Sequence, residues 1–519
     1  MSNKNKARRR TPASQARASQ ARTSQAAAGQ DGDISQAEAD AIVQDVLSKL
    51  WEGVASGDPL RAELETATCM AFPYVLGQRD PADIESFIDT VLVKGAVRRR
   101  NPDGAALLRL LMTLGTPTTR RAASRALAEL TGEGIYPPEW VTEIGKVTPG
   151  QAWRRYDVFG DDEAMAVTFS YGETEHGLVV QVDLAGIPVA TTIGVSSDGA
   201  KLIEVISGNN EEFDRSEQIS LTEARGRMLR PLDRAGRDES PKLSPSSIAY
   251  LPVAKSRLRR LPEGDGEARP VYTAADRAAA VEEFMTSPEA AEAVTADEAS
   301  TRFWAEVLTG YSGRISGEPP DQVGPRKLAH ILLGHVPNTF VLTPAQRDHL
   351  EPAAAAWVRW SATRRELGEA GTAVLMEQLP RVLSRFGEAY DDPDAAAIRG
   401  YASGLATSAA DVSWLSDSVG RRMFALPIPE QHAPLDLSDP ADRHRLVAEE
   451  FGECTPPPGL TSEEFVEAAY GVVEELWRDE DNPTYQTASR LFADGLSRHD
   501  VIHRLAGSPA PTVGSSVIR

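Results

Sequence analysis

The stretch that decides the fold is AMAVTFSYGETEHGLVVQVDLAGIPVATTIGVSSDGAKLIEVI, residues 164–206. Its β-branched and apolar residues fall into four runs, at 164–171, 177–184, 187–195 and 200–206. Glycine-containing turn signals separate these runs, and such short connections join antiparallel strands. The stretch therefore predicts a small antiparallel β-meander. Within the second run Asp183 alternates with valines, which places it on the polar face of a half-buried strand.

Helical patterns flank this region on both sides. Apolar residues recur every three or four positions at 106–114 and, beyond the meander, at 274–284, 296–308 and 372–386. We therefore expect a mainly α, multi-domain protein, α+β overall, in which helical bundles accompany one small antiparallel β-meander. The expected parts are a disordered basic arm at 1–32, a helical domain at 33–148, the sheet with a helix at 149–245, a linker at 246–272, a helical domain at 273–425, a proline-rich connector at 426–460, a C-terminal helical domain at 461–507 and a tail at 508–519.

The composition excludes several classes of protein. Of 519 residues only two are cysteines, Cys69 and Cys454, which excludes a disulfide-stapled secreted fold and a cysteine-based zinc ribbon. No apolar run approaches the length needed to cross a bilayer, so we expect no membrane association. The polar stretch after the first ten residues predicts that no secretory signal is present. These features favour a cytoplasmic protein.

The charge is unevenly distributed along the chain. The formal net charge is −21, yet residues 1–30 contain seven basic residues and no acidic one. An acidic body repels the phosphate backbone, so nucleic-acid contact is expected only through the arm. The candidate contact residues are Lys4, Lys6, Arg8, Arg9 and Arg10. A solvated tail without a partner is the alternative interpretation.

The most specific local motif is the pair His499 and His503. Histidines at positions i and i+4 share one helix face, as metal chelation requires. The motif differs from H-E-x-x-H because Asp500 replaces the glutamate that acts as general base in metallohydrolases. Asp500 is one methylene shorter, and no third ligand follows it in the sequence.

A structural interpretation explains the same residues. Ser497 and Asp500 have the spacing of a capping box that begins a helix, and Leu496 and Val501 have the spacing of a hydrophobic staple. The helical wheel places both histidines off the apolar stripe. Metal binding, a hydrogen-bonding role and an interaction surface therefore all remain open for this pair.

Other candidates have ordinary structural explanations. His330 and His335 are five residues apart, which does not suit a shared helix face, and a core or boundary position is expected for His330. Trp357 and Trp360 lie near arginines, as in some nucleic-acid-binding helices, but tryptophans three residues apart are typical of a helical core. The signatures of P-loop ATPases, Rossmann dehydrogenases and α/β-hydrolases are missing from the sequence.

Two stretches resemble known bacterial proteins. The segment DNPTYQTASRLFADGLSRHDVIHRLAG, residues 481–507, resembles the end of a bacterial domain family of unknown function, in which the helix reads R-H-E-x-x-H. Residues 156–183 and 296–369 resemble large multi-domain bacterial proteins that are uncharacterised. This resemblance covers about a quarter of the chain. It implies a mostly helical fold with a β insertion and implies no activity.

We therefore expect a non-catalytic protein-interaction or scaffold protein with a protein partner. One alternative is a metal-dependent hydrolase that uses His499 and His503. A second alternative is a nucleic-acid-associated factor that acts through the basic arm. The sequence identifies no catalytic residue and no cofactor.

Overall fold

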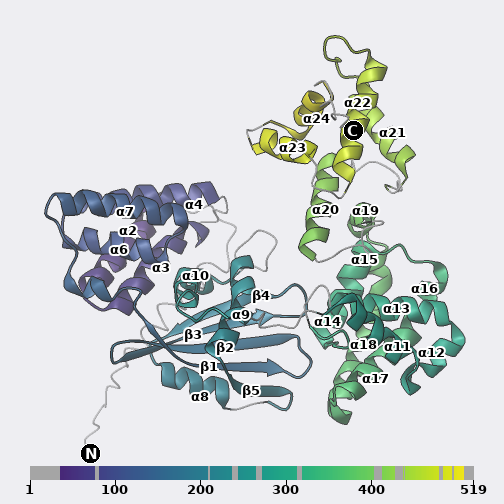
Figure 1. Cartoon of the computed structure of the whole chain (residues 1–519), viewed down its shortest axis with the longest axis horizontal. Coiled ribbons are helices and arrows are strands. Elements are labelled where there is room, and N and C mark those ends of the chain that lie inside the picture. The colour runs from purple at the N-terminus through teal and green to yellow at the C-terminus, as the bar shows by residue number, and fades with distance from the viewer. Residues whose placement is uncertain are drawn as a thin grey trace, which may run out of the picture. The chain divides into compact units, whose positions relative to one another are not determined.

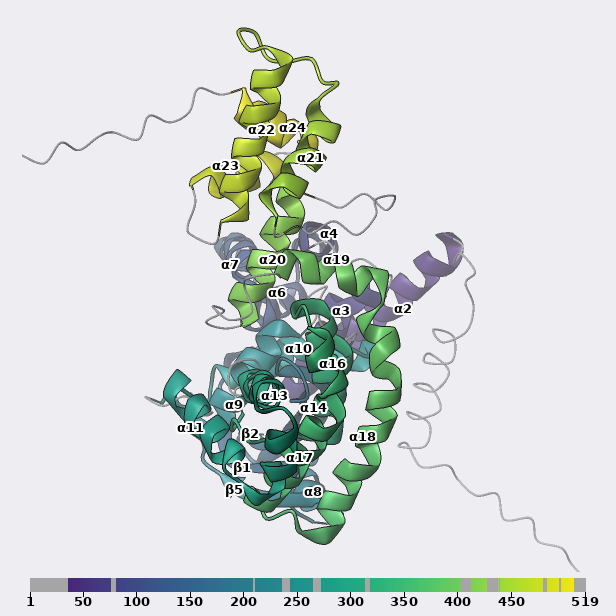
Figure 2. The same cartoon turned by 90° about the vertical axis from the view of Figure 1, so that its right-hand side faces the viewer.

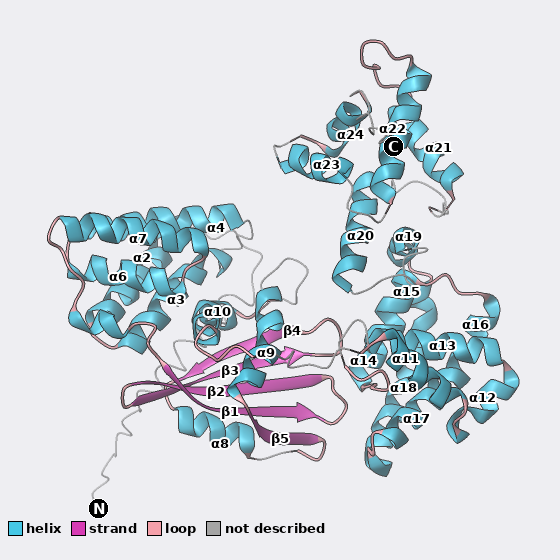
Figure 3. Cartoon of the chain, in the orientation of Figure 1, coloured by secondary structure: helices cyan, strands magenta, loops and turns pink. Residues whose placement is uncertain are grey.

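The computed structural model of the chain describes residues 36–75, 81–208, 211–235, 243–264, 272–312, 318–402, 412–426, 437, 439–478, 483–493 and 496–507. The expected arm and tail, with the candidate residues Lys4, Lys6, Arg8, Arg9 and Arg10, lie outside these residues. Helices make up most of the described chain, and its strands form one antiparallel sheet (Figures 1 and 3). The expected mainly α, multi-domain class with a small sheet is thus confirmed. No described helix is long and apolar enough to span a membrane.

The chain divides into two compact units, the first of which ends at Thr142. This unit is helical. Its helix α6 begins where the side chain of Asn101 accepts the backbone N–H of Gly104 at 2.9 Å. The apolar stripe expected at 106–114 is buried in α6, where Leu107, Leu108 and Leu111 are fully covered. The elements are α2 (Gln36–Ala55), α3 (Pro59–Val75), α4 (Pro81–Phe87), the π-helical turn η1 (Ile88–Val93), α5 (Lys94–Arg99), α6 (Pro102–Leu114), α7 (Pro117–Gly132) and the 3-10 turn η2 (Glu139–Glu143).

The second unit begins with a five-stranded antiparallel sheet. Its strands are β1 (Thr148–Asp157), β2 (Asp162–Tyr171), β3 (Thr174–Asp183), β4 (Val189–Ser196) and β5 (Asp214–Ile219), in the order β4-β3-β2-β1-β5. β2, β3 and β4 are the first three predicted runs. The alternation predicted in β3 is confirmed, because Val180 and Val182 are buried whereas Gln181 is exposed. β1 and β5 carry many charged and polar residues, so their composition did not identify them as strands.

Helices cover both faces of the sheet. Helix α8 (Gly199–Ser207) packs Ile203 and Ile206 against Ala166, and helices α9 (Leu221–Arg234) and α10 (Pro245–Leu258) cover the opposite face. The fourth predicted strand, at 200–206, is wrong because these residues form α8. The helix begins where the Asp198 side chain accepts the backbone N–H of Lys201 at 2.9 Å. Three-residue spacing between the buried isoleucines then fits a helix against a sheet.

Two intervals expected as connectors contain packed helices. The predicted linker at 246–272 begins inside α10, whose residues Ala254 and Leu258 are buried in the sheet core. Pro245 occupies the first turn of α10, where proline is tolerated, and its basic residues lie in the last turn. The predicted connector at 426–460 likewise contains α21 (Pro440–Phe451). The prolines in the first turns of α10 and α21 and the basic residues in the last turn of α10 led to the prediction of linkers, although these residues begin and end helices.

A helical domain follows the sheet. Phe284 packs edge-on against Trp357 and Trp360, with ring centroids 5.0 and 5.6 Å away, so the expected core role of both tryptophans is confirmed. Figure 2 shows the long helix α18 along one side of this domain. The elements are α11 (Ala274–Met285), η3 (Pro288–Ala290), α12 (Ala291–Ala296), α13 (Glu298–Gly310), α14 (Pro325–His330), η5 (Ile331–His335), α15 (Val336–Thr339), α16 (Pro344–Asp348), α17 (Leu350–Arg364), α18 (Gly368–Tyr390) and α19 (Pro393–Ala402).

A separate hydrophobic core organises the C-terminal helices. They are α20 (Val412–Ala425), α21 (Pro440–Phe451), α22 (Ser462–Trp477), α23 (Pro483–Ala493) and α24 (Arg498–Ala506). Phe451 and Phe465 lie fully buried at its centre. Arg443 and Glu474 form a two-armed ion pair at 2.6 and 3.0 Å between α21 and α22. The expected C-terminal helices at 461–507 are thus present, and they pack together with α20 and α21, which precede them.

Candidate functional site in the C-terminal helices

Helix α24 carries the histidine pair, and its first turn forms the Ser497 half of the predicted capping box, whereas the Asp500 carboxylate accepts from the Ser497 hydroxyl and not from its backbone N–H. The hydroxyl of Ser497 accepts the backbone N–H of Asp500 at 3.1 Å and donates to the Asp500 carboxylate at 2.6 Å. Leu496 and Val501 both join the hydrophobic core, as expected for a staple. Asp500 is therefore committed to helix initiation. Its side chain takes no part in the contacts of either histidine described below.

His499 contacts Glu450 in the last turn of α21 and Cys454 in the segment that follows this helix. Its Nδ1 lies 3.1 Å from Oε1 of Glu450, and its Nε2 lies 3.6 Å from Sγ of Cys454. The ring stacks on Phe451 with the centroids 4.7 Å apart and the planes 7° apart. Both nitrogens and one face of the imidazole are thus fixed by the protein. The result is a line of three groups, thiol, imidazole and carboxylate.

The direction of these hydrogen bonds follows from the carboxylate. An ionised Glu450 can only accept, so Nδ1 of His499 carries the hydrogen and donates it. Nε2 then holds a free lone pair, which faces the thiol of Cys454. This thiol also lies 3.6 Å from the backbone carbonyl oxygen of Glu450, a second acceptor for its proton. Partial burial, together with the carboxylates of Glu450 and Glu453, raises the pKa of the Cys454 thiol. The protonated thiol of Cys454 is therefore favoured over its thiolate.

Arg498 holds this end of α24 in place. Its Nε and Nη2 each donate at 2.7 Å to backbone carbonyl oxygens at the end of α20, those of Phe424 and Ala425. Its Nη1 donates to Oε1 of Glu450 at 2.5 Å. One guanidinium thus ties α20, α21 and α24 together. It also neutralises the carboxylate on which His499 depends.

His503 has different partners from His499. Its Nε2 lies 3.2 Å from the backbone carbonyl oxygen of Thr455. The centroid of its ring lies 4.7 Å from the ring centroid of Phe465. The rings of the two histidines are 6.3 Å apart. Among the described residues, no group of three or more His, Cys, Asp or Glu side chains is placed to hold a metal ion. The metal assignment of His499 and His503 stays a prediction from their spacing.

A surface on α20 and α23 gathers exposed apolar side chains. Phe492 is 54% exposed and meets Phe424 edge-on with the ring centroids 5.6 Å apart. Met423, which precedes Phe424 in α20, is 45% exposed. The guanidinium of Arg421 lies 5.4 Å from the ring centre of Tyr485. Tyr485 and Phe492 are seven residues apart, so they share one face of α23. We call Arg421, Met423, Phe424, Tyr485 and Phe492 the aromatic surface.

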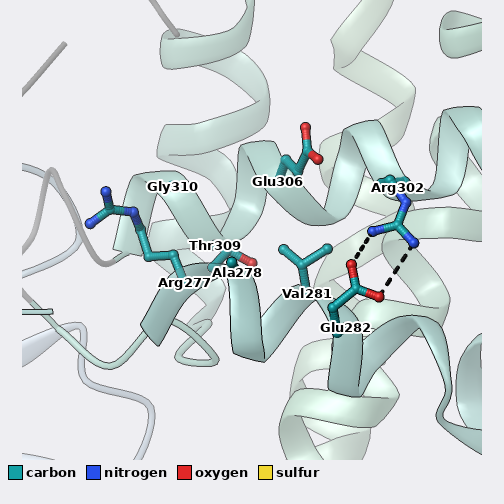
Figure 4. Close-up of a pocket in the computed structure, with 8 residues that line it drawn as sticks. All are labelled: Arg277, Ala278, Val281, Glu282, Arg302, Glu306, Thr309 and Gly310. Atoms are coloured by element: carbon teal, nitrogen blue, oxygen red, sulfur yellow. Dashed lines mark hydrogen bonds and ion pairs between the residues drawn. The ribbon is translucent and has the colours of Figure 1, made fainter. Parts of the chain in front are cut away.

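A small hollow lies between α11 and α13 (Figure 4). It has a volume of about 270 Å³ and is lined by Arg277, Ala278, Val281, Glu282, Arg302, Glu306, Thr309 and Gly310. The ion pair between Arg302 and Glu282 occupies one end of it (Figure 4). The two arginines balance the two glutamates. With no imidazole or thiol among its lining residues, this hollow offers less chemistry than the Cys454 cluster.

The other sequence candidates have structural surroundings. Asp183 pairs with Arg326 of α14, so the polar face of β3 meets the helical domain. His176 is buried and accepts the Nε–H of Arg257 at 3.0 Å. Burial, then the charge of Arg257, lowers the pKa of His176 to about 3, which keeps it neutral. His330, expected in or beside the core, is exposed.

Sequence reasoning did not single out Cys454 and Glu450 as site residues. They lie more than 40 residues before His499, and neither has a spacing that marks a motif. The one available signal was the scarcity of cysteine. Only the packing of α21 against α24 brings the three side chains together.

Comparisons with protein-family models, curated proteins and solved structures return no match for this chain, and the resemblance to bacterial domain families stays a prediction.

Proposed function

We propose that this chain is a non-catalytic protein-interaction protein and that the aromatic surface is its docking site. The observation that carries this proposal is the exposure of Met423, Tyr485 and Phe492 on two adjacent helices. Large aromatic side chains and arginine are enriched where proteins bind one another, and clustered exposed apolar residues mark such sites. A cytoplasmic bacterial setting accords with the two free cysteines and with the sequence resemblance.

The partner is a protein segment with apolar side chains flanked by carboxylates. Arg421 lies over Tyr485, so its guanidinium places a positive charge on the aromatic surface of a chain whose formal net charge is −21. An acidic segment would pair with this guanidinium group while its apolar residues cover Phe492. Charge complementarity of this kind speeds encounter and excludes wrong partners.

The test compares three baits in affinity purification followed by direct binding. The baits are the wild type, the double variant Met423→Ala/Phe492→Ala, and Tyr136→Ala, which removes a side chain that is 64% exposed elsewhere in the chain. We expect partners of the wild type and of Tyr136→Ala to be lost from the double variant. A purified partner should bind the double variant at least tenfold more weakly. Equal retention by all three baits would refute the aromatic surface as the docking site.

The metal-dependent hydrolase and the nucleic-acid-associated factor remain alternative predictions. Nothing in the contacts of His499 and His503 favours a metal-dependent hydrolase over the interaction protein. The basic arm that would serve a nucleic-acid-associated factor lies outside the described residues.

A further inference from the structure

We propose that Cys454 is a base-activated nucleophilic thiol and a site of covalent modification by small uncharged electrophiles, peroxides in particular. His499 acts as its general base, and Glu450 positions the imidazole. The arrangement rests on two contacts, 3.6 Å from Sγ to Nε2 and 3.1 Å from Nδ1 to the carboxylate. A nucleophile, a base and an orienting acid are the three parts that activated thiols and hydroxyls use in enzymes.

The site is accessible to solvent. The His499 side chain is 41% exposed, and Cys454 is half-buried at the edge of the core. Cys69, the other cysteine, is 1% exposed, and burial raises its pKa to about 12. Cys454 is thus partly exposed beside a base, whereas Cys69 is buried. The reactivity of Cys454 can therefore be compared with that of Cys69 in the same molecule.

The electrostatics select the class of electrophile. Arg498 pairs with Glu450, which leaves Glu453 as the carboxylate that acts on the sulfur without this neutralisation, so an anionic reagent is repelled more than an uncharged one. These carboxylates also disfavour a free thiolate, so the thiol must lose its proton as it reacts. His499 Nε2 is in position to take that proton.

A peroxide would oxidise the Cys454 thiol to a sulfenic acid, with His499 transferring the proton. The Cys454 thiol gives its proton to His499 Nε2 while sulfur attacks the nearer peroxide oxygen and forms an S–O bond. The O–O bond breaks, its electron pair leaves on the far oxygen, and this oxygen takes the proton back from His499 to leave as water or an alcohol. Sulfur is oxidised by two electrons to a sulfenic acid, and the peroxide is reduced.

The experiment measures modification of each cysteine in the full-length chain. Wild type, Cys454→Ala, His499→Phe and His503→Phe are treated with iodoacetamide or with hydrogen peroxide plus dimedone, and both cysteine peptides are quantified by mass spectrometry. His499→Phe keeps a ring to stack on Phe451 but removes the base. His503→Phe is the matched control on the same helix. Cys69 reports on folding, since it becomes reactive only if the first unit opens, and circular dichroism checks the helices.

We expect Cys454 to react in the wild type while Cys69 does not. His499→Phe should slow modification of Cys454 at least tenfold, since a general base contributes a hundredfold or more. His503→Phe should change the rate less than twofold.

The proposal is overturned if Cys454 is as inert as Cys69, or if it reacts equally fast without His499. It is also overturned if added Zn²⁺ protects Cys454 and a chelator restores the reaction, because the cluster would then be a metal site. The docking test uses other residues, so the two proposals can fail separately.

Discussion

Asp161 Oδ2 lies 2.6 Å from the backbone nitrogen of Arg326, so a carboxylate from the sheet caps a helix of the neighbouring domain. Oδ1 of the same side chain accepts the backbone N–H of Lys327 at 3.1 Å. The residue at the cap position of α14 is Gly324, which has no side chain to offer. A Cβ at Gly324 would lie 2.3 Å from Asp161 Oδ1. Glycine is therefore required there so that a distant carboxylate can do the capping.

This link predicts that Asp161→Ala destabilises the sheet and the helical domain together. The variant leaves two N–H groups of α14 without their acceptor, one of them on the buried Lys327. We expect the free energy of unfolding to fall by about 1–3 kcal/mol. Urea unfolding followed by tryptophan fluorescence measures this change. Asp162→Ala, which removes the adjacent, half-buried carboxylate that pairs with the Arg326 side chain, is the control and should cost less. Equal losses in the two variants would contradict the capping role.

The same carboxylate predicts a pH dependence. Burial raises the pKa of Asp161 from 3.8 to about 6, although the two N–H groups oppose this shift. A raised carboxyl pKa means that the folded state holds its proton more tightly than the unfolded state. The contribution is therefore complete below about pH 4 and is lost as the pH rises through 6.

Comparison with Asp161→Asn isolates this effect. Between pH 4 and pH 6.5 the free energy of unfolding of the wild type should fall relative to that of the variant, by about 2 kcal/mol. Parallel urea titrations at several pH values measure the difference. A constant difference across this range would show that Asp161 ionises in the folded protein as it does in the unfolded chain.

A buried lysine beside this cap gives a third prediction. Lys327 is fully buried, and its Nζ has no hydrogen-bond partner among the described residues. Burial lowers its pKa, against the pull of the carboxylates of Glu318 and Asp161. Lys327→Met keeps the length of the side chain and removes the cost of burying an amine, so we expect unchanged or higher stability. Lys201→Met, at an exposed position, should stay within about 0.5 kcal/mol of the wild type. A loss above 1 kcal/mol in Lys327→Met alone would mean that the ammonium group contributes net attraction.

Much of the fold could be predicted because it depends on local pattern. The alternation in β3, the stripe of α6 and the capping signal of α24 are each contained in about ten residues. The strands β1 and β5 were missed because pairing with β2 and β1, not composition, makes them strands. Helix α8 was mistaken for a strand because Leu, Ile and Val suit both structures, and only the cap at Asp198 separates them.

The candidate site depends on contacts far apart in sequence. The spacing of His499 and His503 indicated a shared helix face, but their partners come from α21 and the segment that follows it. Cys454 meets His499 across 45 residues. Likewise, the burial of Lys327 and the capping by Asp161 arise where the sheet meets α14. No spacing rule covers such pairs, so their chemistry could only be found in the folded chain.

Two glycines with positive φ provide a final prediction. Gly160 and Gly172 have φ of +75° and +57°, in the left-handed region that favours glycine. A Cβ at Gly172 would meet nothing within 4 Å, whereas a Cβ at Gly160 would lie 1.1 Å from Nε2 of Gln322. That amide is buried and donates to the backbone carbonyl oxygen of Phe159 at 3.0 Å, which fastens the β1–β2 turn to the segment before α14.

Gly172→Ala should therefore cost only the backbone strain, about 1 kcal/mol. Gly160→Ala should cost the same strain plus the displacement of Gln322 and the loss of its hydrogen bond, about 2–4 kcal/mol in all. Urea unfolding of the two variants measures the difference, in which the strain of a positive φ is present on both sides. The double variant Gly160→Ala/Gln322→Ala removes the obstructing amide and should be less destabilised, relative to Gln322→Ala, than Gly160→Ala is relative to the wild type. If the two glycine variants lose equal stability, the contact between Gln322 and the turn contributes nothing, and the attachment of the sheet to the helical domain rests on the contacts that Asp161, Asp162 and Asp183 make with α14.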